Sequence, residues 1–440
     1  MRISFIVKPF QVELLGIAYL AAVLKQRGHV VTLVKVGPYM KDELNLVQPN
    51  ILAYTATTGQ HQFYLDLNRK IKNDWQISIL GGPHATYFPE VIYEKGLNAV
   101  FRGEAEISIL NFVHKIEMNK NKLEVEKEVI QPGPLETTLD NIPLPDRPFL
   151  YTYIENYNNP IKNVMTSRGC PFNCPYCYNS LYRKLYHKLE PDKPWVRFRS
   201  PHNVLEEVIH LQENYPLKMI FFQDDEFLAN PELEHLLLRY KQLGKVPFHC
   251  QIRIELLNEA KVKLLKEAGC YSVTFAIESG DYLVRKNMLN RRITDDQIIK
   301  GANLLKKYGI KFRTENMVGL PGERLSEMLK TIQLIKKVRP TIGWCSIFQP
   351  YPNLPLAEYA KQERYWDGKM NMKESFFETT TLFTLYKKEI INIQRLFGLI
   401  VWLNLPLWIV KRMIKVTNNP FFDRIFKWVK RNRYKVLYKQ

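Results

Sequence analysis

Short β-branched runs alternate with helical patterns along most of this chain, and this alternation restricts the fold more than any other feature. In residues 1–125, five runs are expected as strands: 2–7, 30–36, 50–56, 77–82 and 98–103. Apolar residues recur with helical spacing in 13–28 and 62–72, and Gly28 is the expected end of the first helix. Strand and helix in this order predict a parallel sheet with right-handed crossovers, a Rossmann-like or flavodoxin-like domain.

The same alternation resumes in residues 161–360. Six runs are expected as strands: 162–169, 218–225, 248–255, 271–279, 311–319 and 343–350. Six strands with intervening helices predict a partial (β/α)6 barrel, in which chemistry belongs at the strand C-termini. Residues 126–160 are expected as an extended proline-rich linker, and 361–440 as a helical, basic C-terminal region. The predicted fold class is therefore α/β, with a Rossmann-like sheet, a partial barrel and a helical end.

The turns that follow the strands of the first domain are rich in small residues. Glycine lets a backbone approach a ligand closely, and parallel sheets bind ligands at this edge. Such turns are also ordinary strand-to-helix connections, so both interpretations stay open. The residues proposed to contact a cofactor are Thr57, Gly81, Gly82, Gly103 and Glu104.

Composition and charge restrict the compartment and the partners. Six cysteines in 440 residues do not form a disulfide framework, and the N-terminus reads as a strand rather than a signal peptide. A cytoplasmic location is expected. The formal net charge of +19 suggests an anionic partner, but no nucleic-acid-binding module accompanies it, so nucleic acid is not expected.

Much of the charge lies near the C-terminus, after an apolar run at 396–410 that Asn404 and Pro406 interrupt. The run is shorter than a membrane-spanning helix requires. One interpretation is a helix lying on the inner face of a membrane, with basic and aromatic residues at the interface. The other is a helical subdomain that packs on the barrel and presents a solvated basic face. The sequence does not separate them.

Three cysteines, Cys170, Cys174 and Cys177, lie within one predicted loop after the first barrel strand. Structural zinc almost always takes four ligands, and the other cysteines are scattered along the chain. An iron–sulfur cubane takes one cysteine per iron, so three cysteines leave one iron open. An open position is what a catalytic metal needs. The remaining cysteines, Cys250, Cys270 and Cys345, are expected to be small buried side chains.

The loop resembles the radical S-adenosylmethionine superfamily, through its C-x3-C-x2-C spacing and the aromatic Tyr176 before the last cysteine. The resemblance implies a [4Fe-4S] cluster whose open iron is chelated by S-adenosylmethionine, which is cleaved to a 5′-deoxyadenosyl radical. The stretches 224–227, 275–280 and 317–323 resemble the family's other motifs. They implicate four residues in cofactor binding: Asp225, Glu278, Ser279 and Gly319. A helix cap is the alternative role for Asp225. Arg253 and Glu255 are expected to point into the barrel.

The stretches 16–31, 81–90 and 101–106 resemble the cobalamin-binding domain of one branch of that superfamily. The branch's usual D-x-H-x-x-G motif, whose histidine ligates cobalt, is absent from the first loop, and neither His61 nor His84 has that context. Members without the histidine also hold cobalamin, so cobalamin is implied. A sheet that has lost the cofactor is the alternative.

The resemblance implies methylation of an unactivated carbon. The apolar, basic C-terminal region favours a hydrophobic, lipid-like substrate, and an electron donor such as flavodoxin or ferredoxin is expected. Oxidative cyclisation or a radical rearrangement without methyl transfer is the second hypothesis. A non-catalytic iron–sulfur or zinc protein is the third. The sequence identifies no residue of the protein as itself catalytic.

Overall fold

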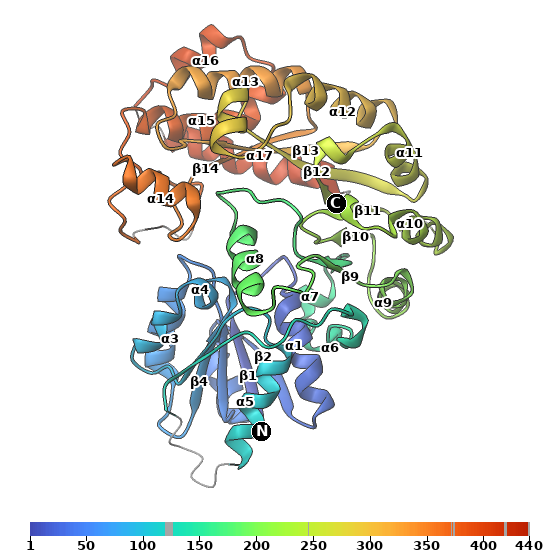
Figure 1. The fold of residues 1–440 in the computed structure, drawn as a ribbon, viewed down its shortest axis with the longest axis vertical. Helices are drawn as coiled ribbons and strands as arrows, with labels where there is room; N and C mark the ends of the chain where they lie inside the picture. Colours follow the sequence, from blue (N-terminus) through green and yellow to red (C-terminus); the bar gives the residue numbers. More distant parts are fainter. Residues whose placement is uncertain (119–125, 245, 371, 373–374, 418–419, 439–440) are drawn as a thin grey trace. The chain divides into compact units, whose positions relative to one another are not determined.

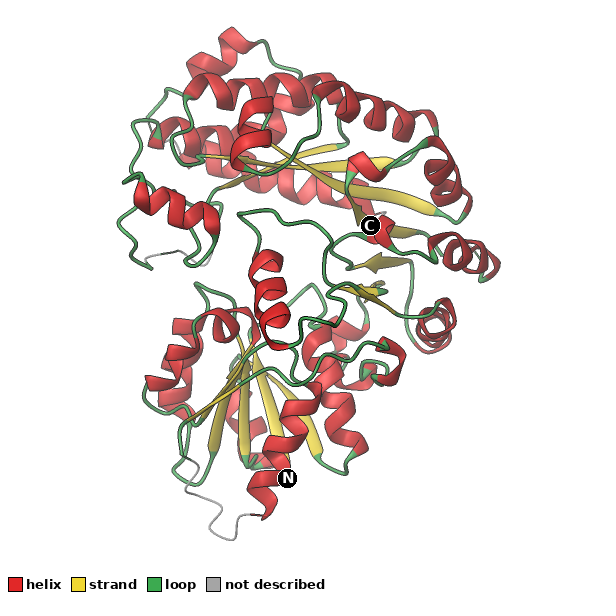
Figure 2. Cartoon of the chain, viewed as in Figure 1, coloured by secondary structure: helices red, strands yellow, loops and turns green. Residues whose placement is uncertain are grey.

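The computed structural model describes all residues except 119–125, 245, 371, 373–374, 418–419 and 439–440. The expected domain boundary at residue 125 therefore lies outside the described residues. The chain divides into two compact units (Figures 1 and 2). Unit 1 comprises 1–163, 185–194 and 210–216, and unit 2 comprises the remainder.

Unit 1 is built on a parallel sheet of six strands in the order β2-β1-β3-β4-β5-β6. The strands are β1 (Arg2–Val7), β2 (Val30–Lys35), β3 (Ile51–Thr55), β4 (Ile77–Gly81), β5 (Ala99–Phe101) and β6 (Glu128–Ile130). The first five confirm the prediction. The sixth was not predicted, because its three residues fall in the segment expected to be a linker.

The helices of unit 1 connect these strands and bury its core. They are α1 (Leu15–Gln26), α2 (Met40–Val47), α3 (His61–Ile71), α4 (Gly82–Tyr87), α5 (Glu106–Met118), α6 (Arg147–Leu150) and α7 (Ile154–Tyr157), with short 3-10 turns at Pro89–Tyr93 and Leu139–Asn141. Gly28 follows α1 with a φ of +79°, a conformation that glycine adopts without strain. One core cluster includes Ile6, Leu52, Leu80 and Val100, which lie on neighbouring strands.

Unit 2 contains the predicted partial (β/α)6 barrel. Its sheet has six strands in the order β14-β13-β12-β11-β10-β7, which is the reverse of chain order. They are β7 (Ile161–Val164), β10 (Met219–Phe222), β11 (Phe248–Ile252), β12 (Cys270–Glu278), β13 (Lys311–Val318) and β14 (Ile342–Ile347). Residues 161–163 of β7 are counted with unit 1, which ends its first segment there. A small antiparallel pair, β8 (Ser167–Arg168) and β9 (Arg197–Phe198), was not predicted.

Helices follow the barrel strands in turn, with short 3-10 turns at Phe227–Ala229 and Ile254–Leu256 and a π-turn at Val284–Met288. The helices are α8 (Tyr178–Leu189), α9 (Pro201–Asn214), α10 (Leu233–Gln242), α11 (Glu259–Glu267), α12 (Asp295–Lys307) and α13 (Leu325–Val338). The α8 helix begins in unit 2, and its last residues belong to unit 1. Because the strands are parallel, their carboxyl ends share one edge, where the cysteine loop and the polar motifs lie.

The C-terminal region is helical, as expected, and much of it is packed. It contains α14 (Pro355–Gln362), α15 (Lys387–Trp402), α16 (Leu407–Met413) and α17 (Pro420–Tyr438). Leu396, Phe397 and Ile400 of the apolar run are buried, and Phe397 lies against Gly343 of β14. The interruption at Asn404 and Pro406 is the turn between α15 and α16. Among the described residues, no helix is long and apolar enough to cross a membrane.

Candidate functional site

The cysteine loop presents three partly exposed, free thiols. Gly169 precedes it with a φ of +88°, and a Cβ there would lie 2.6 Å from the carbonyl oxygen of Trp195. The Cys177 amide donates to the Cys174 carbonyl oxygen at 3.1 Å, which closes a turn before α8. The loop therefore holds its thiols by backbone contacts, and glycine is required at its start.

Each cysteine sulfur receives a hydrogen bond. The backbone amides of Phe172 and Asn179 donate to Cys170 and Cys177 respectively. The Cys174 sulfur accepts from Arg253 Nη1 at 3.3 Å. Hydrogen bonds to the sulfurs are one way in which proteins tune iron–sulfur clusters, so this donor set fits a cluster held by three thiolates.

Arg253 and Glu255 lie directly after β11. The Arg253 guanidinium stacks on the Phe172 ring, 3.9 Å from its centroid, and pairs with the Glu255 carboxylate. The predicted Arg–Glu pair is present, although Glu255 lies in a 3-10 turn rather than in the strand. Its arginine contacts the cysteine loop, which the sequence alone left open.

A second chain of contacts joins the cysteine loop to the end of β12. The Tyr176 hydroxyl donates to Glu278 Oε1 at 3.0 Å. Arg291 Nη1 lies 3.4 Å from that hydroxyl, and its Nη2 lies 3.8 Å from Glu255 Oε2. Tyr176, Glu278, Arg291, Glu255 and Arg253 therefore form one network that begins and ends at the cysteine loop.

Glu278 is held in an unusual conformation within this network. Its φ is +69°, in the left-handed region, and the β12–β13 register shifts between Ala276 and Glu278. Backbone strain of this kind in a non-glycine residue is often found at functional sites. Burial raises the pKa of Glu278 to about 7, against the opposing effect of Arg291. The side chain therefore sits between its charged and neutral forms near neutral pH.

The Ser279 side chain, by contrast, forms its hydrogen bond within its own loop. It is fully buried, its hydroxyl accepts from the Asp281 amide at 3.2 Å, and its carbonyl oxygen accepts from Arg285 at 2.8 Å. The structure thus places Glu278 beside the cysteine loop and gives Ser279 a local bond. A role for Ser279 in cofactor binding stays a prediction.

The three acidic residues that follow β10, at positions 224–226, make different contacts. Buried Asp224 accepts from the Thr166 amide and hydroxyl, the latter at 2.7 Å, and so anchors the strand that leads to the cysteine loop. Exposed Asp225 accepts from the Asn179 side chain, and its charge acts on Cys170. The helix-capping role that was the alternative for Asp225 belongs to Glu226, which accepts from the Leu228 amide at 2.9 Å.

Gly319 lies in a turn closed by Glu323. The amides of Gly319 and Leu320 both donate to Glu323 Oε2, at 2.7 and 3.1 Å. Burial raises the pKa of Glu323 to about 8. Gly319 has a φ of +76°, and Ile390 carbons lie 3.1–3.5 Å from where its Cβ would stand. Ile390 of α15 therefore fills the space on one side of Gly319, where a cofactor contact was predicted.

The other cysteines behave as predicted and are buried. In the described part of the chain, no three His, Cys, Asp or Glu side chains surround a single metal-ion position. Burial raises the pKa of Cys170 to about 12 and that of Cys177 to about 11, and the negative charge of Asp225 also raises both.

In unit 1, the predicted loop residues Thr57, Gly81 and Gly82 lie at the carboxyl ends of the adjacent strands β3 and β4. Thr57 is exposed. Gly82 has a φ of +89°, and a Cβ there would lie 2.6 Å from Thr55 Oγ1. Glycine at position 82 is thus explained by its close packing against β3. Of these three predicted residues, Thr57 is the exposed one.

A stacked histidine pair lies at the same edge of the sheet. The His61 and His84 rings are 3.7 Å apart and nearly parallel, and His84 Nδ1 lies 3.2 Å from Thr58 Oγ1. Burial, and secondarily the His61 charge, lower the pKa of His84 to about 3. Burial also lowers the pKa of His61. Both imidazoles are therefore neutral at neutral pH.

The turn at Gly103 and Glu104 follows β5. The Glu104 amide donates to the Tyr186 hydroxyl at 2.6 Å, and the Gly103 amide donates to Thr86 Oγ1 at 3.0 Å. A Cβ on Gly103 would lie 2.5 Å from the Tyr186 hydroxyl. Tyr186 is thus the residue that shapes this turn.

The loop after β1 has a structural role. Buried Glu13 pairs with Arg147 Nη1 at 2.7 Å and accepts from the Tyr151 hydroxyl at 2.7 Å. Arg147 Nη2 also donates to the Asn163 carbonyl oxygen at 2.6 Å. The loop after β1 is the place where the branch carries its histidine motif. In this chain that loop is held by Glu13, which pairs with Arg147, and Arg147 in turn bonds to Asn163.

Sequence reasoning missed Asp224, Arg291 and Tyr186. Asp224 stands beside Asp225 in the stretch 224–227, for which the sequence indicated only Asp225, as a cofactor contact; the anchoring role of Asp224 was not predicted. Arg291 follows a π-turn without periodic pattern, and Tyr186 reads as one more aromatic of α8. Nothing in the sequence around Arg291 or Tyr186 indicates that the side chain forms these contacts rather than lying on the surface.

Comparison with known proteins adds the following relatives. The model of the "Radical SAM superfamily" matches residues 164–335. An uncharacterised methyltransferase of Pyrococcus horikoshii is 31% identical over 375 residues, which cover 79% of this chain and 78% of that protein.

Two bacterial proteins are 25% identical. They are the cytidylyl-2-hydroxyethylphosphonate methyltransferase of Streptomyces wedmorensis, matched over 73% of this chain, and the anaerobic magnesium-protoporphyrin IX monomethyl ester cyclase of Rubrivivax gelatinosus, matched over 76%. The matches cover 66% and 64% of those proteins, slightly less than two thirds of each.

Two solved structures share the fold. The cobalamin-dependent S-adenosylmethionine radical enzyme OxsB, solved with aqua-cobalamin and S-adenosylmethionine, gives a TM-score of 0.66 at 15% identity, over 98% of this chain and 71% of its own. The radical S-adenosylmethionine methyltransferase TsrM of Kitasatospora setae, solved with cobalamin and a [4Fe-4S] cluster, gives 0.62 at 16% identity, over 82% of this chain and 75% of its own.

Proposed function

The chain belongs to the radical S-adenosylmethionine superfamily, and from this premise we propose that it is a cobalamin-dependent enzyme that methylates an unactivated carbon of a hydrophobic, lipid-like substrate. The observation that carries the proposal is the network from the three-cysteine loop through Tyr176 to strained Glu278. It joins a cluster site to a carboxylate suited to a cationic ligand.

Cys170, Cys174 and Cys177 hold the [4Fe-4S] cluster in this proposal. Their sulfurs each receive one N–H donor, and one donor is the charged Arg253 side chain. For Cys170 and Cys177, the backbone N–H donors oppose the effect of burial, which raises the pKa of both thiols. The stacking of Arg253 on Phe172 keeps that donor in place.

Glu278 binds the amino group of S-adenosylmethionine in this proposal. Tyr176 and Arg291 orient the carboxylate, and its strained backbone directs it away from the regular strand. Asp225, Ser279 and Gly319 are retained as further proposed contacts, of which exposed Asp225 has the side chain best placed to reach a ligand.

Unit 1 holds cobalamin in this proposal, at the carboxyl edge of its sheet. Thr57 is exposed there, the turns at Gly81, Gly82, Gly103 and Glu104 keep the edge compact, and the half-buried, neutral His61 ring stacks on buried His84. No axial histidine is assigned, because the loop after β1 is occupied by the Glu13–Arg147 pair.

When bound, these cofactors supply a 5′-deoxyadenosyl radical that removes a hydrogen atom from carbon and a methyl group that replaces it. The protein positions them: Glu278 fixes S-adenosylmethionine, Arg253 fixes the cysteine loop, and buried Asp224 fixes the strand before it. No side chain is assigned a covalent role.

The finer proposals concern partners and location. The buried apolar run of α15 belongs to the protein core, so the support for a lipid-like substrate and a membrane contact comes from the exposed basic and aromatic residues around α16. We also propose flavodoxin or ferredoxin as electron donor, and a cytoplasmic location with peripheral contact to the inner face of the membrane.

Oxidative cyclisation is the second candidate function. Its support is the similarity to the magnesium-protoporphyrin monomethyl ester cyclase, which is as identical to this chain as the phosphonate methyltransferase. The two functions differ in the fate of the methyl group, so isotope transfer separates them.

The first test is the metal content of the anaerobically purified chain after reconstitution with iron, sulfide and hydroxocobalamin. About four irons and one cobalt per chain are expected. Cys174→Ala should lose iron and all cleavage of S-adenosylmethionine, whereas Cys345→Ala, in a buried position outside the loop, should keep its iron. Full cleavage by Cys174→Ala would refute the cluster assignment.

The second test assigns the reaction. Labelled methyl from S-adenosylmethionine should appear in the product once a substrate is supplied. Iron without cobalt, together with turnover that leaves the label out of the product, would favour cyclisation or rearrangement.

A further inference from the structure

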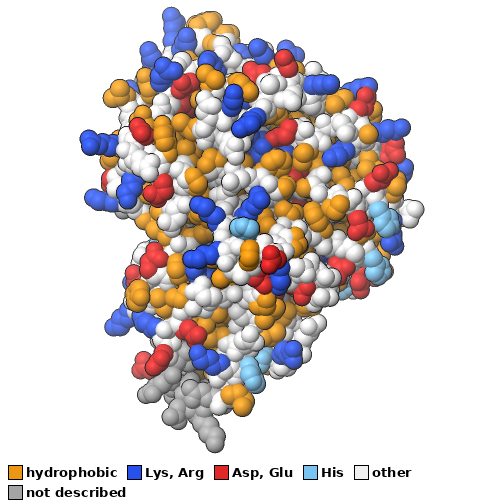
Figure 3. Space-filling model, in the orientation of Figure 1, with side chains coloured by type: hydrophobic (Ala, Val, Ile, Leu, Met, Phe, Trp, Pro, Cys, Tyr) orange, Lys and Arg blue, Asp and Glu red, His pale blue; other side chains and the backbone are white. Residues whose placement is uncertain are grey.

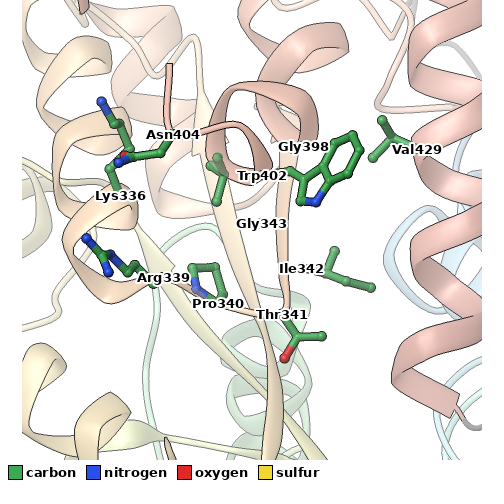
Figure 4. Close-up of a pocket in the computed structure, with 11 residues that line it drawn as sticks. Lys336, Arg339, Pro340, Thr341, Ile342, Gly343, Gly398, Trp402, Asn404 and Val429 are labelled. Atoms are coloured by element: carbon green, nitrogen blue, oxygen red, sulfur yellow. The ribbon is translucent and has the colours of Figure 1, made fainter. Parts of the chain in front are cut away.

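Four basic side chains gather around two adjoining cavities in unit 2, outside the site described above. One cavity, of about 340 Å³, is lined by Lys336, Arg339, Asn404 and Trp402 among others. The second, of about 690 Å³, shares the first three of these residues and adds Lys306 and Lys337. Figure 4 shows Lys336 and Arg339 on one side of the first cavity and the Trp402 ring on the other. We call Lys306, Lys336, Lys337 and Arg339 the basic rim.

The basic rim lacks neutralising carboxylates. No described Asp or Glu forms an ion pair with any of its four members, and residues 399–417 contain no acidic residue. The pKa of Lys306 is lowered by burial and by the charge of Arg339. Lys336 Nζ donates to the Leu405 carbonyl oxygen at 2.6 Å, which holds one cation at the cavity wall. An anion entering the cavity would relieve this repulsion.

Large apolar side chains surround the same place. Trp402, Leu403 and Trp408 are 50%, 50% and 61% exposed, and we call them the apolar rim. Trp402 lines the first cavity, and Leu407, next to Trp408, lines the second. The Arg412 guanidinium lies 5.4 Å from the Trp408 ring centroid. Figure 3 shows hydrophobic and basic side chains side by side at the end of unit 2 where α16 lies.

We propose that the basic and apolar rims form a docking surface for an anionic phospholipid bilayer, with one lipid phosphate entering the cavity between Lys336 and Arg339. Cations attract the anionic leaflet, and tryptophans settle at the level of the headgroups. The proposal rests on the membrane location within the proposed function and is independent of the radical chemistry.

The combination of charge and exposed tryptophan selects this partner. A polyanion alone requires the cations but leaves Trp408 and Leu403 unexplained. An apolar protein partner requires the tryptophans but leaves four unneutralised cations at its edge. A bilayer with acidic headgroups matches both rims at once.

The test is co-sedimentation of the reconstituted full chain with vesicles of phosphatidylcholine, with and without phosphatidylglycerol. Binding is expected only with phosphatidylglycerol, and it should weaken as salt is added. Lys337→Gln/Arg339→Gln should lower the partition coefficient roughly 10- to 30-fold. Trp408→Ser should lower it at every salt concentration. The matched control, Lys218→Gln/Arg239→Gln, removes the same charge from exposed positions elsewhere in unit 2 and should bind as the parent does.

Three results would overturn the proposal: no binding to phosphatidylglycerol vesicles, equal loss in the rim and control variants, or equal binding to both vesicle types. Loss of affinity for a duplex oligonucleotide in the rim variant, with vesicle binding unchanged, would assign the rim to a polyanion instead. Formation of 5′-deoxyadenosine without vesicles is measured in every variant. It should be unchanged in the rim variants, so failure of the docking surface is distinguishable from failure of the proposed reaction.

Discussion

At the scale of single residues, the candidate site depends on polar side chains held by other polar side chains. Tyr176 and Arg291 both contact the environment of Glu278, and neither lies within the segment 275–280 that drew attention to it. A charged, buried carboxylate needs such partners, because an unpaired charge in a low-dielectric interior is strongly disfavoured.

Glu278→Gln is predicted to weaken the binding of S-adenosylmethionine at least tenfold, since hydrogen bonds to a charged group contribute about 1.5–3 kcal/mol. The amide keeps the shape and still accepts from Tyr176, so iron content should not change. Equilibrium dialysis of the reconstituted variant measures the effect. Glu259→Gln, an exposed change on α11, is the control, and unchanged affinity in Glu278→Gln would remove this residue from the site.

His84 predicts a pH dependence of the stability of unit 1. Its pKa falls from an ordinary value near 6.5 to about 3 in the folded protein. The unfolded chain therefore binds more protons between these values, and stability present above 6.5 is lost as the pH falls toward 3. Between about pH 7.5 and pH 5, this histidine should account for a loss of about 2 kcal/mol.

Denaturant unfolding of the chain without cobalamin at several pH values measures this loss. His84→Gln should be less stable at neutral pH but should show a smaller change with pH, whereas exposed His114→Gln should behave like the parent. Parallel pH curves for His84→Gln and the parent would contradict the assignment.

Sequence patterns identified residues that lie close together along the chain. They missed residues that come together only when the chain folds. The three cysteines were found because one loop places them together. Ser279 was indicated because the stretch 275–280 resembles a family motif; the turn after β12 directs its hydroxyl to the Asp281 amide, and its role in cofactor binding stays a prediction. Arg291 and Tyr186 contact residues distant in the sequence, Tyr176 and Glu104 respectively, and no pattern near either residue indicates those contacts.

At the scale of elements, α15 and α17 show how the C-terminal region joins the barrel. Gly398 of α15 leaves so little space that a Cβ there would lie 2.7 Å from Val429 Cγ1 of α17. The serine hydroxyl of Ser272 on β12 donates to the Leu437 carbonyl oxygen at 2.9 Å. These contacts explain why the first part of the apolar run, with Leu396, Phe397 and Ile400, is buried. The later part, with Trp402, Leu403 and Trp408, is exposed, and a membrane contact there stays a prediction.

Gly398→Ala is predicted to destabilise unit 2, because the added methyl meets Val429. Val429→Ala should remove the conflict. The double variant should therefore be more stable than the two single effects predict when added, by about 1 kcal/mol. Thermal or denaturant unfolding of the four proteins measures the coupling, and strict additivity would mean that the helices separate freely.

Element prediction succeeded where the hydrophobic pattern was long and failed where elements were short. Five strands of unit 1 and the six strands of the barrel sheet were predicted at the positions where the structure has them. The strand β6 has three residues, and β8 and β9 have two each. Such short segments carry too few residues for a period-two pattern, and their pairing comes from neighbouring strands already in position.

At the scale of the whole molecule, the two proposed cofactors belong to different units, so each can be lost without the other. Tyr186 is 1% exposed, and its hydroxyl accepts from the Glu104 amide. Removal of that hydroxyl leaves a backbone donor without its partner, which costs about 1–3 kcal/mol when the donor is buried.

Tyr186→Phe is predicted to lower the cobalt content of the reconstituted chain and to leave its iron content unchanged. Both metals are measured on the same preparation by elemental analysis. Tyr282→Phe, an exposed change in unit 2, should alter neither. Equal loss of iron and cobalt in Tyr186→Phe would point to general unfolding rather than to a local effect on the proposed cobalamin edge.

The interleaved order of the two units has a consequence for synthesis on the ribosome. Unit 1 takes residues 185–194 and 210–216 from beyond the start of unit 2, so it is not complete when residue 163 leaves the exit tunnel. Domains generally fold one after another from the N-terminus, but here the first must wait for part of the second. The nascent chain therefore contains all six strands of the unit 1 sheet by residue 130 but lacks the later segments of that unit until the cysteine loop has emerged, so both units reach completion late in translation.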